Sequence, residues 1–164
     1  MIKLLSIKRL QNTALNLWKD ICFIRDGRQC QVQKYFPQLK IAHSEVLQVD
    51  HAFSRKDKNL FLEVSNGTVV CSSCNRLKHF QFKNIHRLID QIVISREGQS
   101  KFNEMQRINE SGQPNIGWSK RYWLEEKIRQ LKNEELRQEE ENKSPLEFTG
   151  FAQESVFAEL RPCD

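Results

Sequence analysis

The stretch from Asn66 to His79, which reads Asn-Gly-Thr-Val-Val-Cys-Ser-Ser-Cys-Asn-Arg-Leu-Lys-His, decides the fold of this chain. Its first two residues form a dipeptide that is typical of tight turns. A short apolar run then leads into Cys71, and Ser72 and Ser73 are good N-terminal caps for a helix. The stretch therefore predicts a turn and then a helix that runs past His79.

The residues before this stretch have the composition of strands. Region 31–53 is expected to be extended, with the apolar residues of 46–49 on one strand. The segment from Tyr35 to Ile41 is expected to be the partner of that strand in a hairpin. The polar residues from Ser54 to Asn59 are expected to form a loop.

Helices are expected on both sides of this centre. Apolar residues recur every three or four positions from residue 5 to about residue 25, and Gly27 is placed to cap the end of that helix. Further helices are expected over 82–95, 100–110 and 118–141. A loop should precede the last of them, because Gly and Pro are concentrated in 111–117.

The chain of 164 residues suits one domain. Residues 1–130 are expected to form the folded unit, and residues 131–164 the end of the last helix and an acidic, flexible tail. The tail region holds four Lys/Arg and nine Asp/Glu, whereas the first 130 residues hold 22 basic and 12 acidic side chains. A unit this basic is expected to bind a polyanion such as nucleic acid, and a merely solvated basic surface is the alternative on charge alone.

Targeting and cysteine content bound the compartment. The chain has no run of about 18 apolar residues, so no membrane span is expected. Its N-terminus lacks the long apolar stretch of a signal peptide, and a cytoplasmic protein is expected. The five cysteines are an odd number and include a Cys-x-x-Cys pair, which favours metal binding over a disulfide framework.

Metal-capable side chains recur at suggestive intervals around the opening stretch. Asp50 and His51 are followed by Asn66 after 15 residues, by Asn75 after nine more and by His79 after four more. Neighbours on a strand point to opposite faces, so Asp50 can bind a metal while His51 addresses the substrate. Asn75 and His79 share one helix face and can converge on the same cation. This mixed set of carboxylate, amide and imidazole suits magnesium, manganese or a similar divalent ion.

The same residues suggest hydrolysis of a phosphodiester. A neutral His51 imidazole can take a proton from an attacking water, while a metal stabilises charge on the phosphate. Asn66 would hold the loop and the His51 ring in orientation. Five basic side chains are candidates for phosphate contacts: Arg76, Lys78, Lys56, Lys58 and Lys83. Taken singly, each of these residues has a structural explanation, such as a core histidine or a solvated lysine, and only the joint spacing favours chemistry.

Asp50-His51, Asn66 and the run from Cys71 to His79 resemble the HNH, or ββα-metal, endonuclease motif, with the spacing of its colicin-type members. The resemblance covers residues 15–82. It implies an α+β fold with a ββα-metal hairpin-plus-helix core, flanked by N-terminal and C-terminal helices. The order of the later helices is similar to that of the NinG (Rap-type) recombination endonucleases of lambdoid phages, which act on branched DNA.

The resemblance also implies the roles of individual residues. Asp50, Asn75 and His79 would be the metal ligands and His51 the general base. The implied cofactor is magnesium or manganese, with zinc or nickel as substitutes in vitro. The implied compartment is the cytoplasm of a bacterial or phage-infected cell.

Cysteine-bearing members of this family hold a structural zinc with two Cys-x-x-Cys pairs. Here the second pair is intact as Cys71-Ser-Ser-Cys74, but Gln33 stands where a cysteine should follow Cys30. Three thiolates leave a tetrahedral zinc site one ligand short. Either His43 or Cys22 completes the site, or zinc has been lost and the cysteines pack as small apolar residues.

The sequence thus predicts a metal-dependent endonuclease that hydrolyses DNA, with branched recombination intermediates as candidate substrates. The alternative is a non-catalytic DNA-binding or adaptor module on a decayed HNH fold, and the complete residue set argues against decay. An RNA target stays open because the motif reads only phosphate, and the oligomeric state also stays open. The residues from Gln153 are weakly similar to the short motif that binds the bacterial sliding clamp, and a frayed acidic tail is the alternative.

Overall fold

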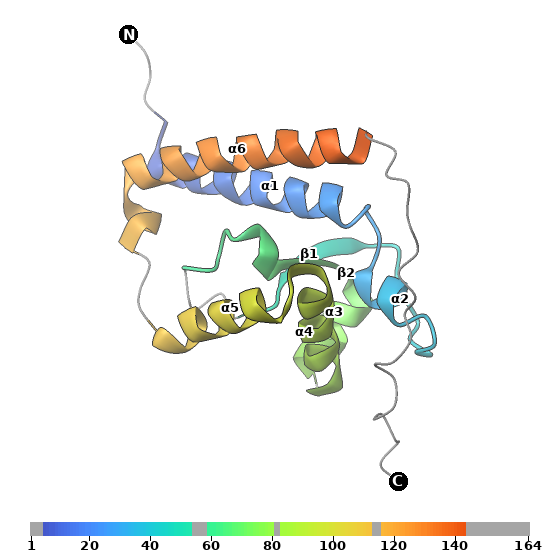
Figure 1. The fold of residues 1–164 in the computed structure, drawn as a ribbon. Coiled ribbons are helices and arrows are strands. Elements are labelled where there is room, and N and C mark those ends of the chain that lie inside the picture. The colour runs from blue at the N-terminus through green and yellow to red at the C-terminus, as the bar shows by residue number, and fades with distance from the viewer. Residues whose placement is uncertain (1–4, 54–58, 81–82, 113–115, 144–164) are drawn as a thin grey trace.

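The computed structural model describes residues 5–53, 59–80, 83–112 and 116–143. In chain order the elements are α1 (Ile7–Arg25), α2 (Gln31–Tyr35), β1 (Leu47–His51), the 3₁₀ helix η1 (Val64–Asn66), β2 (Gly67–Cys71), α3 (Ser72–Phe80), α4 (Lys83–Glu97), α5 (Gln99–Ser111), the 3₁₀ helix η2 (Ile116–Ser119) and α6 (Arg121–Lys143). The expected α+β class is confirmed, because helices surround a small antiparallel sheet of two strands in the described part of the chain (Figure 1).

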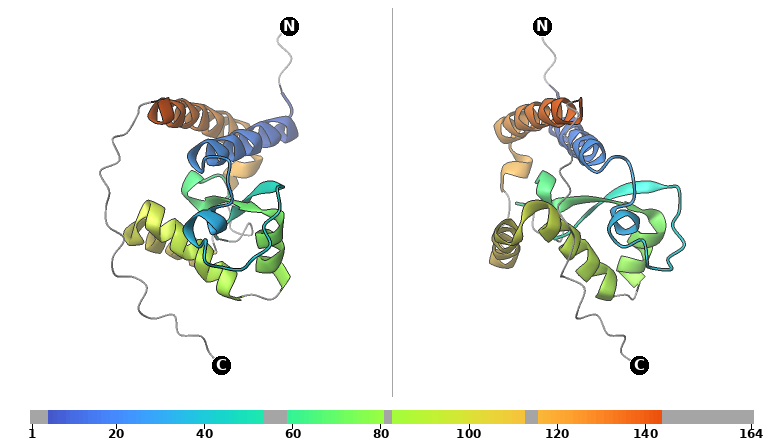
Figure 2. Two further views of the ribbon diagram at one scale, coloured as in Figure 1. Left: turned by 90° about the vertical axis from the view of Figure 1, so that its right-hand side faces the viewer. Right: turned by 45° about the vertical axis from the view of Figure 1, so that its right-hand side comes forward.

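The strand pair lies between two groups of helices. Helices α1 and α6 lie on one side of it and α2 to α5 on the other, as the turned views in Figure 2 also show. Val69 of β2 packs in a core with Trp18 of α1, and Val70 packs in a second core with Ile89 of α4. Every residue of β2 is buried, as expected for a strand that is covered on both faces.

Helix α1 forms where its apolar periodicity predicts it. Leu10, Ala14 and Trp18 follow one another at four-residue spacing and are buried. The helix begins after Ser6, whose side chain accepts a hydrogen bond from the Arg9 backbone at 3.3 Å. It ends before Gly27, which has the positive φ of 66° expected for a C-terminal cap.

The predicted hairpin partner is wrong. Strand β1 pairs antiparallel with β2, with Asp50 opposite Thr68 and His51 opposite Gly67, and not with the segment from Tyr35 to Ile41. Residues 31–35 are helical instead, and the apolar side chains that follow pack into the core beside Val70. A strand between two cores needs apolar side chains on both faces, and Val69 and Val70 of β2 supply them.

The predicted tight turn at Asn66-Gly67 is also absent. Asn66 ends η1, and Gly67 begins β2 with an extended φ of −88°. A Cβ on Gly67 would lie 2.4 Å from Cys22 Sγ and 2.8 Å from Trp18 Cζ2. Glycine is therefore required by the close approach of α1 and not by the turn geometry that the dipeptide usually serves.

The remaining helices confirm their predictions within a few residues. Helix α3 begins at Ser72 and runs past His79, and α4 and α5 cover the segments expected at 82–95 and 100–110. The expected start of the last helix forms the separate turn η2, and α6 then continues to Lys143. The predicted acidic tail beyond it lies outside the described residues. No helix in the described ranges combines the length and apolar character needed to cross a bilayer.

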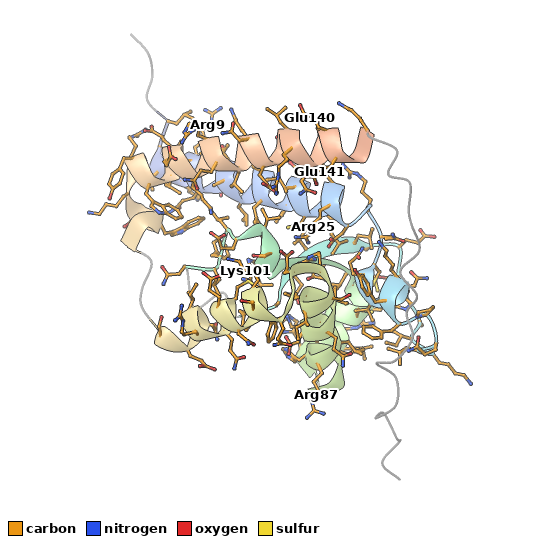
Figure 3. The ribbon with its side chains drawn as sticks, in the orientation of Figure 1. Arg9, Arg25, Arg87, Lys101, Glu140 and Glu141 are labelled. Atoms are coloured by element: carbon orange, nitrogen blue, oxygen red, sulfur yellow. The ribbon has the colours of Figure 1, made fainter. Side chains whose placement is uncertain are left out.

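A buried carboxylate joins the elements around the sheet. Asp26, at the end of α1, is 3% exposed, and its oxygens lie 2.8 Å from Arg25 Nε and 3.4 Å from Arg96 Nη1. The second oxygen also accepts the Val69 backbone N–H of β2 at 2.8 Å. Figure 3 shows Arg25 between α1 and the strand pair. We call Asp26, Arg25 and Arg96 the Asp26 hub.

The two guanidinium groups of the hub also donate hydrogen bonds to backbone carbonyl oxygens of η1 and β2. Arg25 donates to the carbonyl oxygens of Val64 and Gly67 at 2.6 and 2.7 Å. Arg96, at the end of α4, donates to those of Ser65 and Gly67 at 2.8 and 3.0 Å. Helices α1 and α4 are thereby tied to η1 and to the first residue of β2.

Replacing Asp26 by asparagine should test the hub. The substitution keeps the size of the side chain but removes the carboxylate that pairs with two largely buried guanidinium groups. Arg25 loses its counterion, whereas Arg96 keeps its ion pair with Glu97 at 2.6 Å. We expect Asp26→Asn to lower the free energy of unfolding by about 3 kcal/mol in urea denaturation. The matched control is Asp20→Asn, at an exposed site on the same helix, with an expected change below about 0.5 kcal/mol. Equal losses in the two variants would contradict the role of the hub.

Candidate functional site

Four metal-capable side chains meet beside the sheet. They are Cys30, His43, Cys71 and Cys74, and their ligand atoms all lie within 4.8 Å of one another. Cys30 precedes α2, His43 lies in the segment between α2 and β1, Cys71 ends β2 and Cys74 lies in the first turn of α3. Because β2 passes into α3 without a break, the two cysteines of the Cys-x-x-Cys pair face the same point. We call these four residues the Cys/His cluster.

The spacing of the Cys/His cluster suits a tetrahedral ion. Bonds of about 2.3 Å from zinc to sulfur place tetrahedral donors about 3.8 Å apart. Cys30 Sγ lies 3.9 Å from Cys74 Sγ, and His43 Nδ1 lies 3.5 Å from Cys71 Sγ and 3.4 Å from Cys74 Sγ. Three thiols and one imidazole can therefore hold a metal ion such as zinc without rearrangement of the backbone.

The electrostatics of the Cys/His cluster favour a thiolate. Hydrogen bonding with Cys74 lowers the pKa of the Cys30 thiol to about 4, and the same contact raises the pKa of Cys74. A thiolate is the form of cysteine that binds metal. The contact between Cys30 and Cys74 therefore favours the thiolate form that a metal ion requires.

The fourth residue of the cluster is His43 and not Cys22. His43 joins the cluster, whereas Cys22 lies in α1 with its Sγ 3.9 Å from the Val64 carbonyl oxygen. Burial raises the pKa of Cys22 to about 12, so its thiol stays protonated. Gln33, three residues after Cys30, is exposed and outside the cluster.

Asp50 and His51 face opposite sides of the sheet, as the strand alternation predicts. Asp50 turns toward α3, where Lys78 Nζ lies 2.5 Å from its Oδ2 and 2.6 Å from the His51 carbonyl oxygen. Both side chains of this ion pair are less than 10% exposed. Lys78, expected to contact phosphate, therefore points inward to the carboxylate that was expected to bind metal.

The His51 ring lies in an aromatic slot. It stacks on Trp18 with ring centroids 4.4 Å apart and on Phe61 with centroids 5.1 Å apart. His51 Nε2 lies 3.0 Å from the Phe61 carbonyl oxygen. A carbonyl oxygen only accepts hydrogen bonds, so Nε2 is the protonated nitrogen and the lone pair of the neutral ring is on Nδ1.

Asn66 ties together both ends of the segment that follows His51. The residue is fully buried, its Oδ1 accepts from the Phe53 backbone N–H at 2.8 Å, and its Nδ2 donates to the Leu60 carbonyl oxygen at 3.0 Å. Residues 54–58 lie between these two anchors. The side-chain amide thus holds the backbone of Phe53 and the backbone of Leu60 close together, as the hydrogen bond of a turn would.

Asn75 and His79 lie one turn apart on α3, as predicted. Asn75 Oδ1 is buried and has no hydrogen-bond partner among the described residues, and His79 is exposed. A buried acceptor without a hydrogen-bond partner lowers the stability of a fold by about 1–3 kcal/mol. Asn75 Oδ1 is therefore a candidate to bind a metal ion or another ligand.

The other predicted phosphate contacts differ in place. Arg76 is exposed on α3. Lys83 begins α4, but its side chain is not among those described, and Lys56 and Lys58 lie outside the described residues. The clamp-binding motif expected from Gln153 also lies outside them.

Two residues near Asp50 were missed by the sequence reasoning. His86 and Asp90 lie one turn apart on α4, and burial together with the charge of Lys78 lowers the pKa of His86. Burial raises the pKa of Asp90, and the charges of His86 and Lys78 partly oppose that rise. The four-residue spacing on the polar face of α4 was the signal, but only the packing of α4 against α3 shows which charges those residues meet.

Comparison with models of protein families, with curated proteins and with solved structures gives no significant match to this chain.

The Cys/His cluster should bind one metal ion per chain. We expect a titration with Co²⁺ to produce the thiolate-to-metal absorption and the visible bands of a tetrahedral complex, with saturation at one equivalent. His43→Ala should weaken binding at least tenfold, because it removes one of four donors. The matched control is Cys22→Ala, which should leave the spectrum and the stoichiometry unchanged. Loss of the bands in Cys22→Ala but not in His43→Ala would contradict the assignment.

Proposed function

We propose that this chain is a metal-dependent endonuclease of the HNH type that hydrolyses DNA phosphodiester bonds. The observation that carries the proposal is the passage of the antiparallel pair β1–β2 directly into α3. The pair supplies Asp50 and His51, and the helix supplies Asn75 and His79. Residues far apart in sequence thereby come from adjoining elements in the order and spacing of the motif that they resemble.

The proposed general base is His51. The Phe61 carbonyl oxygen holds the proton on Nε2, which directs the basic lone pair to Nδ1. The stacking of Trp18 and Phe61 prevents the ring from turning. Asn66 supports this arrangement from behind, because it fixes the backbone on both sides of the segment that leads to Phe61.

The proposed divalent site consists of Asp50, Asn75 and His79. Its chemistry fits a hard cation, and the orphaned Asn75 Oδ1 is the observation that favours a ligand there. When bound, such an ion supplies charge stabilisation at the scissile phosphate and at the leaving oxygen. The residues themselves provide a carboxylate, an amide oxygen and an imidazole from two elements that the Asp50–Lys78 contact already joins.

We further propose that the Cys/His cluster holds structural zinc. An ion bound there would join α2, the segment of His43, the end of β2 and the start of α3. Its role would be to brace the helix that carries Asn75 and His79, in the position of a zinc that the family usually holds with four cysteines.

A non-catalytic DNA-binding module is the second candidate. The ion pair between Lys78 and Asp50 favours it, because the lysine satisfies the carboxylate that a catalytic metal would need. A protein that had lost its metal would gain from such a replacement, since a buried carboxylate without a cation is unfavourable.

Substitution of His51 should separate the two candidates. We expect His51→Phe to abolish cleavage of plasmid and branched DNA in magnesium or manganese, because phenylalanine keeps the stack but cannot accept a proton. DNA binding, measured in an electrophoretic shift assay without added divalent ion, should be unchanged. His51→Ala should abolish cleavage as well, with circular dichroism as the check on folding. Cleavage by His51→Phe at the parental rate would reject His51 as the base, and no cleavage by the parental protein in any metal would favour the binding module.

Substitution of Lys78 should reveal whether Asp50 can accept a metal. We expect Lys78→Met to lower the free energy of unfolding by about 3 kcal/mol without divalent ions, because it leaves a buried carboxylate unpaired. Added manganese should restore more stability to this variant than to the parental protein, as measured by the midpoint of thermal unfolding. The matched control is Lys132→Met, at an exposed lysine of α6. A manganese response that is equal in all three proteins would contradict a metal site at Asp50.

A further inference from the structure

A hollow of about 480 Å³ lies beside α3, the helix that carries Asn75 and His79 of the proposed active site. Its apolar lining comes from Ile41, Leu77 and Ile85, and its two cations are Lys40 and Arg76. The wall opposite α3 is the segment that leads into His43, a member of the Cys/His cluster. The hollow is therefore built by the same segments that hold the cluster together.

The cations of this hollow are not neutralised. Lys40 and Arg76 are both exposed, and in the described part of the chain neither forms an ion pair or a side-chain hydrogen bond. A second hollow, of about 330 Å³ between η1 and α6, provides the contrast. There Lys127 pairs with Glu63 at 2.7 Å and Arg137 pairs with Glu134 at 2.7 Å. Of these two hollows, the one beside α3 therefore offers positive charge that no described acidic side chain neutralises.

The wall of the hollow is held in place by hydrogen bonds to the start of α3. Ser44 Oγ lies 2.7 Å from Ser72 Oγ, and the Ser72 backbone N–H donates to the Val46 carbonyl oxygen at 2.8 Å. Arg76 follows Asn75 directly on α3. The hollow and the proposed metal site thus share helix α3.

We propose that this hollow binds an unpaired nucleotide of a DNA strand. The base would lie on Ile41, Leu77 and Ile85, and the phosphate would contact Lys40 and Arg76. A nucleotide combines a flat apolar face with a charged phosphate in one unit, which matches an apolar floor between two free cations. Its base is accessible only where it is not stacked in a duplex.

The proposal deepens the proposed function, on which its choice of DNA as ligand rests. A nuclease with this hollow would prefer strands with unpaired bases beside the cleavage point, as in gaps, flaps and branches. An acidic peptide with apolar side chains is the competing occupant, and the chain's own residues 144–164 have that composition.

The test is binding of labelled oligonucleotides to the full-length protein, without added magnesium or manganese so that no strand is cut. We expect a fluorescent oligothymidylate to bind more tightly than a duplex of the same length. The double variant Lys40→Gln/Arg76→Gln should weaken binding of the single strand at least tenfold and reduce the slope of its salt dependence by about one. Leu77→Ala should weaken binding without changing that slope, because it removes a contact to the base and not to phosphate.

The matched control is the double variant Arg107→Gln/Lys132→Gln, which removes two exposed cations from α5 and α6. It should leave the affinity for the single strand within twofold of the parental value. Equal losses in the two double variants, or equal affinity for single strand and duplex, would overturn the proposal. It would also be overturned if a labelled peptide of residues 144–164 needed Lys40 and Arg76 for binding while the oligonucleotide did not. Plasmid cleavage, measured separately, reports on the proposed function, since strand binding can depend on Lys40 and Arg76 whether or not the protein cuts.

Discussion

The buried carboxylate of Asp26 is the interaction on which the rest of the structure depends. It accepts hydrogen bonds from two guanidinium groups and from the backbone of β2, and those groups in turn hold the carbonyl oxygens around the start of that strand. Charge-assisted hydrogen bonds of this kind are strong where water is excluded. The hub therefore sets the position of β2 relative to α1 and α4. Strand β2 in turn pairs with the strand of Asp50 and His51 and leads into the helix of Asn75 and His79.

Two cores meet at that strand and divide the molecule by chemistry. Toward α1, the core holds Trp18 and the aromatic slot of His51. Toward α2 to α4, the core holds the cysteines of the Cys/His cluster and lies beside the Asp50–Lys78 pair. One pair of strands thus offers an imidazole on one face and metal-capable groups on the other, and the alternation of side chains along β1 is the physical reason.

The Asp50–Lys78 ion pair conflicts with the proposed metal site, because Lys78 already neutralises the carboxylate that the metal ion would bind. A buried ion pair stabilises a fold only when both charges are satisfied, and here the lysine also donates to the His51 carbonyl oxygen. A divalent ion at Asp50 would have to compete with that ammonium group. The buried Asn75 oxygen favours the nuclease, because it has no hydrogen-bond partner among the described residues and could bind an ion. The two observations favour different candidates, and neither of them follows from the residue spacing.

Local patterns in the sequence determined the long helices, the caps of α1 and α3 and the opposite facing of Asp50 and His51, but not the helix α2 or the strand pair β1–β2. The periodicity of α1, the cap at Gly27 and the serines before α3 depend on contacts within a few residues, and they were predictable for that reason. Only the tertiary structure decided the partner of β1, the fourth member of the Cys/His cluster and the burial of Lys78 against Asp50. Each of these depends on contacts between segments distant in sequence, such as His43 with Cys71 or Lys78 with Asp50. Gly67 shows the same limit, because the close approach of Trp18 requires glycine there and no local pattern records that approach.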